Sequence, residues 1–275
     1  MAVEFSRNIT FGQYLNLGSP IHRLDPRTKI LAVSALMFAI LLTRTFGGLA
    51  VALVGAALIF AFARVPLGYT LRGMRLLANT MLVIFVFQVL FFRAPPERTL
   101  WSWWILSFSW DGVFQGSLTL LRVLLLYYLV NTLMFTTPLM DLADGTEIML
   151  EPLKRLRVPV NELVMTLVVA LKFVPLLVAE LERLIKAQTA RGARFDQGSL
   201  LQRARKLGAV LIPLFVNALG RAEVLTTAMD ARCYRGGRGR TKRRVLTFRR
   251  ADGLALGLAL LLAAAAIVVS RVIGI

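Results

Sequence analysis

Residues 172–192 read K-F-V-P-L-L-V-A-E-L-E-R-L-I-K-A-Q-T-A-R-G, and residues 211–233 read L-I-P-L-F-V-N-A-L-G-R-A-E-V-L-T-T-A-M-D-A-R-C. Each segment contains one proline, and each ends in Ala-Arg followed by a small residue: Ala190-Arg191-Gly192 and Ala231-Arg232-Cys233. The prolines, Pro175 and Pro213, are 38 residues apart and the arginines are 41 apart, so the region is an imperfect internal duplication. The remainder of the chain has the character of a membrane anchor for this pair.

Both segments are predicted to be long amphipathic helices outside the membrane. In the first, apolar residues recur at helical spacing from about 160 to 191, which indicates one continuous helix. Glu162 and Lys172 interrupt its most apolar part, where charges in lipid are costly. The apolar core of the second, Leu207–Leu219, is short for a crossing. Pro175 and Pro213 are expected to kink the helices, because each removes a backbone hydrogen bond.

The composition is that of an integral membrane protein. Of 275 residues, 57% are hydrophobic and only 17% are charged, and the mean hydropathy is +0.68. A soluble domain could not bury that much apolar surface. We expect an all-α fold with transmembrane helices at about 26–43, 46–63, 76–92, 112–135 and 251–275. Asp25 is predicted to cap the first of them, with Pro26 in its first turn.

Basic residues indicate the orientation. Region 138–250 holds 21 of the 33 Lys and Arg residues but only 10 of the 15 Asp and Glu residues. By the positive-inside rule this region and the N-terminus are cytoplasmic, as is a predicted basic loop at Arg64–Arg75. The chain then divides into a membrane region (1–137), a cytoplasmic region (138–250) and a C-terminal span (251–275).

The sequence lacks the residues that several classes of function require. The net charge of +18 is assigned to loops beside anionic lipid and not to nucleic acid, because no aromatic–basic module accompanies it. With one histidine and one cysteine, a Cys/His metal site or a Cys–His nucleophile is not expected. No G-x-x-x-x-G-K-[ST] loop is present, so ATP chemistry would have to come from partner subunits.

The two Ala-Arg ends have a structural and a functional interpretation. An arginine at a helix C-terminus opposes the negative end of the helix dipole, and Gly192 suits the left-handed residue that ends a helix. Two copies at the ends of duplicated helices favour a further role. A projecting guanidinium fork suits insertion into a partner's pocket, against carboxylates or carbonyls.

Further motifs extend the pattern: S-P-I-H-R-L-D-P-R-T-K (19–29), T-T-P (136–138) and P-L-K-R-L-R-V-P-V (152–160). With the two Ala-Arg segments, they resemble the transmembrane (T) component of energy-coupling factor (ECF) transporters, which are prokaryotic vitamin and metal uptake systems. The likeness covers most of residues 12–250. Cys233 departs from the family's Ala-Arg-Gly pattern, which puts a glycine-type cap at that position in question.

The resemblance implies a non-catalytic scaffold in the prokaryotic cell (inner) membrane. Such a scaffold joins two ABC-type ATPase subunits to a small substrate-binding S component for import of a vitamin or other micronutrient. Arg191 would dock into one ATPase and Arg232 into the other, while ATP and Mg stay on those partners and this chain holds no cofactor. The apolar face of the two coupling helices would contact the S component through Leu167, Leu171, Val174, Val178, Leu211 and Leu214.

Two alternatives are weighed against the scaffold. A membrane enzyme acting on lipid or prenyl groups would need clustered acids, and Asp141, Asp144, Glu147 and Glu151 are the only such cluster. A secondary transporter should show two repeated membrane halves, whereas the duplication here lies in the cytoplasmic region. Arg122, inside the fourth predicted span, is expected to face the helix bundle.

Overall fold

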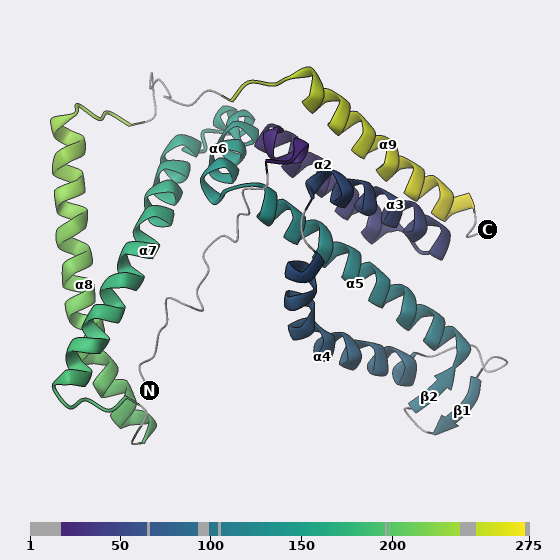
Figure 1. The fold of residues 1–275 in the computed structure, drawn as a ribbon, viewed down its shortest axis with the longest axis horizontal. Coiled ribbons are helices and arrows are strands. Elements are labelled where there is room, and N and C mark those ends of the chain that lie inside the picture. The colour runs from purple at the N-terminus through teal and green to yellow at the C-terminus, as the bar shows by residue number, and fades with distance from the viewer. Residues whose placement is uncertain are drawn as a thin grey trace. The chain divides into compact units, whose positions relative to one another are not determined.

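The computed structural model describes residues 18–64, 67–92, 99–103, 106–195, 197, 199–236 and 246–272 (Figure 1). In chain order the elements are η1 (Pro20–Arg23), α2 (Pro26–Leu42), α3 (Phe46–Ala63), α4 (Leu67–Phe91), β1 (Thr99–Trp103), β2 (Leu106–Ser109), α5 (Trp110–Thr136), α6 (Leu139–Met149), η3 (Glu151–Leu156), α7 (Val160–Ala190), α8 (Leu200–Ala231) and α9 (Arg250–Val272).

The chain forms two compact units. The bundle unit consists of Tyr14–Gly145 and Leu246–Ile275, and the paired-helix unit takes in Thr146–Val245. The expected all-α membrane fold is confirmed. It has one addition, an antiparallel hairpin in which Trp101 of β1 is paired with Phe108 of β2. Aromatic residues and serines alternate along T-L-W-S-W and L-S-F-S, the two-residue period of a strand, so the sequence did carry a signal for this hairpin.

Within the described residues, five helices are long and apolar enough to cross a membrane: α3, α5, α7, Ala204–Ala231 of α8, and α9. The number equals the prediction, but the membership differs. Helix α2 has only 17 residues, and the apolar part of α4 is the shorter stretch Leu77–Phe91. Helices α7 and α8 qualify in their place, so their expected position outside the membrane stays a prediction.

The predicted basic loop Arg64–Arg75 is wrong for most of its length, because α4 begins at Leu67. Pro66 directly precedes this helix in the sequence. A proline suits the start of a helix, where no partner is needed for the missing N–H. Arg72 and Arg75 of the expected loop therefore lie on α4, ahead of the span predicted at 76–92, and Arg64 is the C-cap residue of α3.

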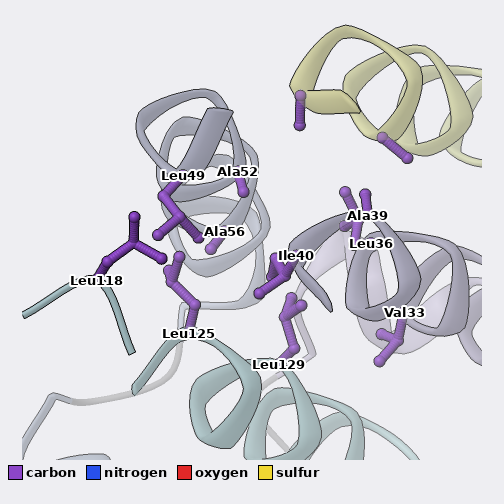
Figure 2. Close-up of a cluster of buried hydrophobic side chains, with 12 residues drawn as sticks. Val33, Leu36, Ala39, Ile40, Leu49, Ala52, Ala56, Leu118, Leu125 and Leu129 are labelled. Carbon is purple, nitrogen blue, oxygen red and sulfur yellow. The ribbon is translucent and has the colours of Figure 1, made fainter. Parts of the chain in front are cut away.

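The core of the bundle unit lies where α2, α3, α5 and α9 meet (Figure 2). Figure 2 shows Ile40 of α2 beside Leu129 of α5, with Leu49 of α3 on the other side of the cluster, and all three are fully buried. Inside lipid such helices associate by close van der Waals packing more than by a hydrophobic driving force. The core combines large side chains with alanines, which let the helix backbones approach closely.

Helix α9 packs against α2 and α3 through small residues (Figure 1). Ala259 and Ala263, four residues apart on one face of the helix, are buried, whereas a Cβ on Gly257 would meet no atom within 4 Å. The closest approach is at Gly48 of α3, where a Cβ would lie 2.8 Å from the carbonyl oxygen of Ala266. Glycine is required at position 48 because any side chain would separate α3 from α9.

The motif at 19–29 joins the ends of three helices. Asp25 caps α2 as expected, because its Oδ1 accepts from the Arg27 N–H at 2.9 Å. Asp252 of α9 is 1% exposed, and its Oδ1 accepts from the Asp25 N–H at 2.7 Å. The Lys29 ammonium donates to the carbonyl oxygen of Thr136, the last residue of α5, at 3.0 Å. This motif therefore has a structural role in the bundle unit.

Arg122 faces the bundle, as predicted. Its Nη2 donates to the carbonyl oxygen of Thr43, which is the C-cap residue of α2. The cation thereby meets the negative end of the α2 dipole and a carbonyl left without a partner in the helix. Arg122 fixes α5 to the turn between α2 and α3.

Candidate functional site

Helix α7 ends in a Schellman cap built around Arg191. Gly192 has the left-handed φ of 88°. Its N–H donates to the Thr189 carbonyl at 2.9 Å, and the Ala193 N–H donates to the Gln188 carbonyl at 3.0 Å. These two bonds define the motif, and they close the helix so that Arg191 is its C-cap residue. The capping role predicted for Gly192 is confirmed.

Helix α8 ends in the same cap although a cysteine replaces the glycine. Cys233 has a φ of 55°. Its N–H donates to the Asp230 carbonyl at 2.9 Å, and the Tyr234 N–H donates to the Met229 carbonyl at 3.1 Å. The question raised by the sequence is thereby answered: the glycine-type cap forms at Cys233, and a residue with a Cβ adopts the left-handed conformation there.

We expect Cys233→Gly to stabilise the end of α8 by about 1 kcal/mol, because glycine adopts a left-handed φ without the steric cost that a Cβ brings. The measurement is the thermal unfolding midpoint of the purified protein. Cys233→Ala is the matched control, since it removes the thiol and keeps the Cβ, and it should leave the midpoint unchanged. Equal stabilisation by both variants would contradict the strain argument.

Both caps present their arginine to the outside. Arg191 and Arg232 are exposed, and within the described part of the chain neither guanidinium has an ion-pair partner. The backbone of each arginine is fixed by the cap while its side chain stays available. Such a pair can form charge-assisted, bidentate hydrogen bonds with an external acceptor.

The two helices cross at a polar contact that sequence reasoning missed (Figure 1). The Glu180 side chain on α7 is only 11% exposed. Its Oε1 accepts from Asn217 Nδ2 at 3.2 Å, and its Oε2 accepts from Arg221 Nη2 at 3.2 Å. Arg183, one turn along α7, adds a third contact at 3.4 Å. We call Glu180, Asn217 and Arg221 the crossing cluster.

Two residues of the crossing cluster occupy equivalent positions in the two repeats. Glu180 and Arg221 are 41 residues apart, which is the offset between Arg191 and Arg232, and each lies 11 residues before its arginine. At 1.5 Å per residue, each helix extends about 16 Å from the crossing to its cap. Equivalent positions of the two repeats therefore meet at the crossing, and the two arms beyond it are equal in length. The 41-residue offset was the signal that could have identified this pair.

The connection between the helices is held by α8. Lys206 Nζ donates to the carbonyl oxygens of Arg194 at 2.7 Å and Gln197 at 2.8 Å. Helix α8 itself begins with a capping box formed by Ser199 and Gln202. These bonds fix the backbone just after the first cap, so Arg191 projects from an ordered turn.

Pro175 and Pro213 each lie inside a helix that continues past them. Each proline lies between the start of its helix and the residue at the crossing. The kinks expected at these positions stay predictions.

The apolar surface expected to contact an S component is partly exposed. Leu167 is 46% and Leu211 54% exposed, while Leu171, Val174, Val178 and Leu214 are half-buried. On α8 the most exposed apolar residues include two that were not predicted, Ile212 and Phe215. Only 6% of the apolar stretch of each helix is buried, against 28% in α5. Such a surface needs lipid or another protein to cover it.

The described residues form no metal centre of the kind that a metal-dependent enzyme would need. Across the described residues, no three His, Cys, Asp or Glu side chains lie close enough to hold a metal ion. Asp141, Asp144 and Glu147 lie on α6 and Glu151 begins η3, so the acids of the alternative are spread along two elements. The lipid- or prenyl-enzyme alternative is not supported.

Comparison with known proteins identifies the family. The model of the family described as cobalt transport protein (CbiQ) matches residues 18–243. Curated relatives named energy-coupling factor transporter transmembrane protein EcfT include one from Ruminiclostridium cellulolyticum, which is 37% identical over 92% of this chain and 93% of its own length. Another, from Acidaminococcus fermentans, is 40% identical over 90% of this chain and 91% of its own.

A third relative of the same name, from Thermanaerovibrio acidaminovorans, is 38% identical over 99% of this chain and 100% of its own length. These matches extend across both the bundle unit and the paired-helix unit. The chain therefore belongs to the family of energy-coupling factor transporter transmembrane proteins, and it is the multi-pass membrane component of an ECF transporter.

Proposed function

We propose that this chain is the non-catalytic scaffold that joins two ABC-type ATPase subunits to a small substrate-binding S component. In this proposal Arg191 docks into one ATPase and Arg232 into the other. The observation that carries it is the pair of matching caps, each presenting an exposed arginine at an equal distance from the crossing cluster. Two like arms suit a partner that is itself a pair of like subunits.

The crossing cluster gives these arms a common fixed point. Because Glu180 contacts both Asn217 and Arg221, a displacement of one cap is transmitted to the other helix through the crossing. Coupling of this kind needs only rigid-body motion of α7 and α8 with the ATPase subunits. The exposed apolar surface around Leu167, Leu211 and Phe215 would then carry that motion to the S component.

The orientation in the membrane follows from charge. With 21 of the 33 Lys and Arg residues in region 138–250, α7 and α8 lie on the cytoplasmic side of the cell membrane, and so does the N-terminus. Their length and composition would also allow a crossing. A crossing by one of them alone, however, would carry part of this basic region to the outer face.

Nucleotide chemistry is assigned to the partners. The sequence contains no phosphate-binding loop, so ATP and Mg would be held by the ATPase subunits and no cofactor by this chain. The transported vitamin or micronutrient would be selected by the S component.

The test is capture of the intact complex. A tagged chain is extracted from its native membrane in mild detergent, and the proteins that come with it are identified by mass spectrometry. We expect ATPases with phosphate-binding loops together with one small membrane protein, whose bound ligand names the substrate. A chain that is recovered alone, stable and monodisperse, would refute the scaffold.

A further inference from the structure

A pocket of about 430 Å³ lies in the bundle unit. It is located where α2 begins, α3 ends and α9 begins. Its lining includes Pro20, Arg23, Leu24, Arg64, Arg249 and Asp252. Nothing in the docking proposal uses this pocket.

Three arginines reach the pocket from separate parts of the chain. Arg23 ends η1, Arg64 is the left-handed C-cap residue of α3, and Arg249 directly precedes α9. All three are exposed. Within the described residues, none of their guanidinium groups has an ion-pair partner. Unpaired guanidinium groups that line one concave site attract an anion with several oxygens.

The one carboxylate in the pocket does not neutralise them. Asp252 is buried, its Oδ1 accepts from the Asp25 N–H, and its Oδ2 accepts from the Arg249 N–H at 2.7 Å. Both oxygens are therefore occupied by backbone donors. Three cations and one anion leave an excess of two positive charges in the pocket. The bond to Asp252 also fixes the Arg249 backbone without engaging its side chain.

The predicted spans place the pocket at a membrane surface. Helices α2 and α3 correspond to the spans predicted at 26–43 and 46–63, and consecutive spans run in opposite directions, so the start of α2 and the end of α3 would lie at the same face of the bilayer. The start of α9 lies there as well, because its residues line the same pocket. This is the level of the lipid phosphates, and basic pockets between spans at this level recognise anionic headgroups. Pro20 and Leu24 add an apolar wall on which a glycerol backbone can pack.

We propose that Arg23, Arg64 and Arg249 bind the headgroup phosphate of an anionic phospholipid. The site is separate from the docking arginines. Its occupant would hold the ends of α2, α3 and α9 together at the membrane surface.

The test titrates phosphatidylglycerol into the purified full-length chain in detergent and measures bound lipid by native mass spectrometry. The triple variant Arg23→Gln, Arg64→Gln, Arg249→Gln should bind it on the order of a hundredfold more weakly, because each basic contact contributes roughly a fivefold factor. The matched control, Arg155→Gln with Arg157→Gln and Arg205→Gln, removes the same charge from exposed positions of the paired-helix unit and should bind like the wild type.

Two further arms identify the source of the phosphate. Phosphatidylcholine should bind weakly, because its choline cation is repelled by the arginines, and excess inorganic phosphate should not displace phosphatidylglycerol. Displacement would assign the pocket to a soluble phosphate instead of a lipid. Wild-type binding by the triple variant, or equal binding of the two lipids, would overturn the proposal. If the triple variant is not obtained folded, the three single variants should each bind roughly fivefold more weakly.

Discussion

Arg191→Glu and Arg232→Glu together should abolish association with the ATPase subunits while the protein stays in the membrane. Each arginine ends a helix as an exposed cation without a partner in the described chain. Losing one partner of a buried, hydrogen-bonded charge pair costs about 2–5 kcal/mol at an interface. Each single variant should therefore bind its ATPase roughly 30-fold or more weakly, and the reversed charge adds repulsion. Co-purification from solubilised membranes measures this.

Arg205→Glu is the control for the charge reversal. Arg205 is exposed on α8 and belongs to neither cap, so its substitution should leave ATPase recovery unchanged. The caps themselves are formed by backbone groups, so neither docking variant should alter helix content or the unfolding midpoint. If the double variant still recovers ATPases at the wild-type level, the docking assignment is wrong.

Much of the paired-helix unit was predictable because its signals are local. The apolar stripe from 160 to 191 gave α7, and the Ala-Arg ends located both caps. A left-handed residue at a helix end depends on the geometry of a few consecutive peptide groups. The role of Gly192 as such a residue could therefore be predicted from the sequence. That of Cys233 could not, because whether a Cβ is tolerated at a left-handed φ depends on the two cap hydrogen bonds that surround it.

Contacts between segments far apart in the sequence were not predicted. The Asp25–Asp252 bond links residues 227 positions apart, and no periodicity indicates it. Glu180 appeared in the sequence as one more charge on an amphipathic helix, and its only link to Arg221 was the 41-residue offset of the duplication. The start of α4 differs from the prediction for another reason: basic residues occur in the first turns of a helix as readily as in a loop, and Pro66, which suits a helix start, was the local signal for it.

The prediction that α7 and α8 lie outside the membrane depends on the distribution of charged residues. Hydropathy and length permit both helices to cross. What opposes a crossing is the basic region that follows each helix, together with a polar crossing cluster that would have to be accommodated in lipid. Glu180 and Arg221 at the contact between two helices are better tolerated near water than at the centre of a bilayer.

Glu180→Ala should weaken the crossing of α7 and α8 and uncouple the two arms. The carboxylate accepts from Asn217, Arg221 and Arg183, and its side chain is almost buried, so its loss leaves donors unpaired. Hydrogen bonds to charged groups contribute about 1.5–3 kcal/mol each when solvent is excluded, and the half-exposed Arg221 lowers that figure toward 1 kcal/mol. We expect a lower unfolding midpoint and at least a tenfold loss of ATP-dependent uptake, with ATPase recovery retained because both caps remain.

A double-mutant cycle with Arg221→Met separates the crossing contact from a general loss of stability. If the two residues interact as the structure shows, the second substitution should cost little once the first is made, giving a coupling of about 1 kcal/mol. Glu180→Gln keeps an acceptor and should fall between the wild type and the alanine variant. Glu223→Ala, on the exposed side of α8, should have no effect. Strict additivity of Glu180→Ala and Arg221→Met would mean that the arms are not joined through this pair, and the equal lengths beyond it would then have no mechanical consequence.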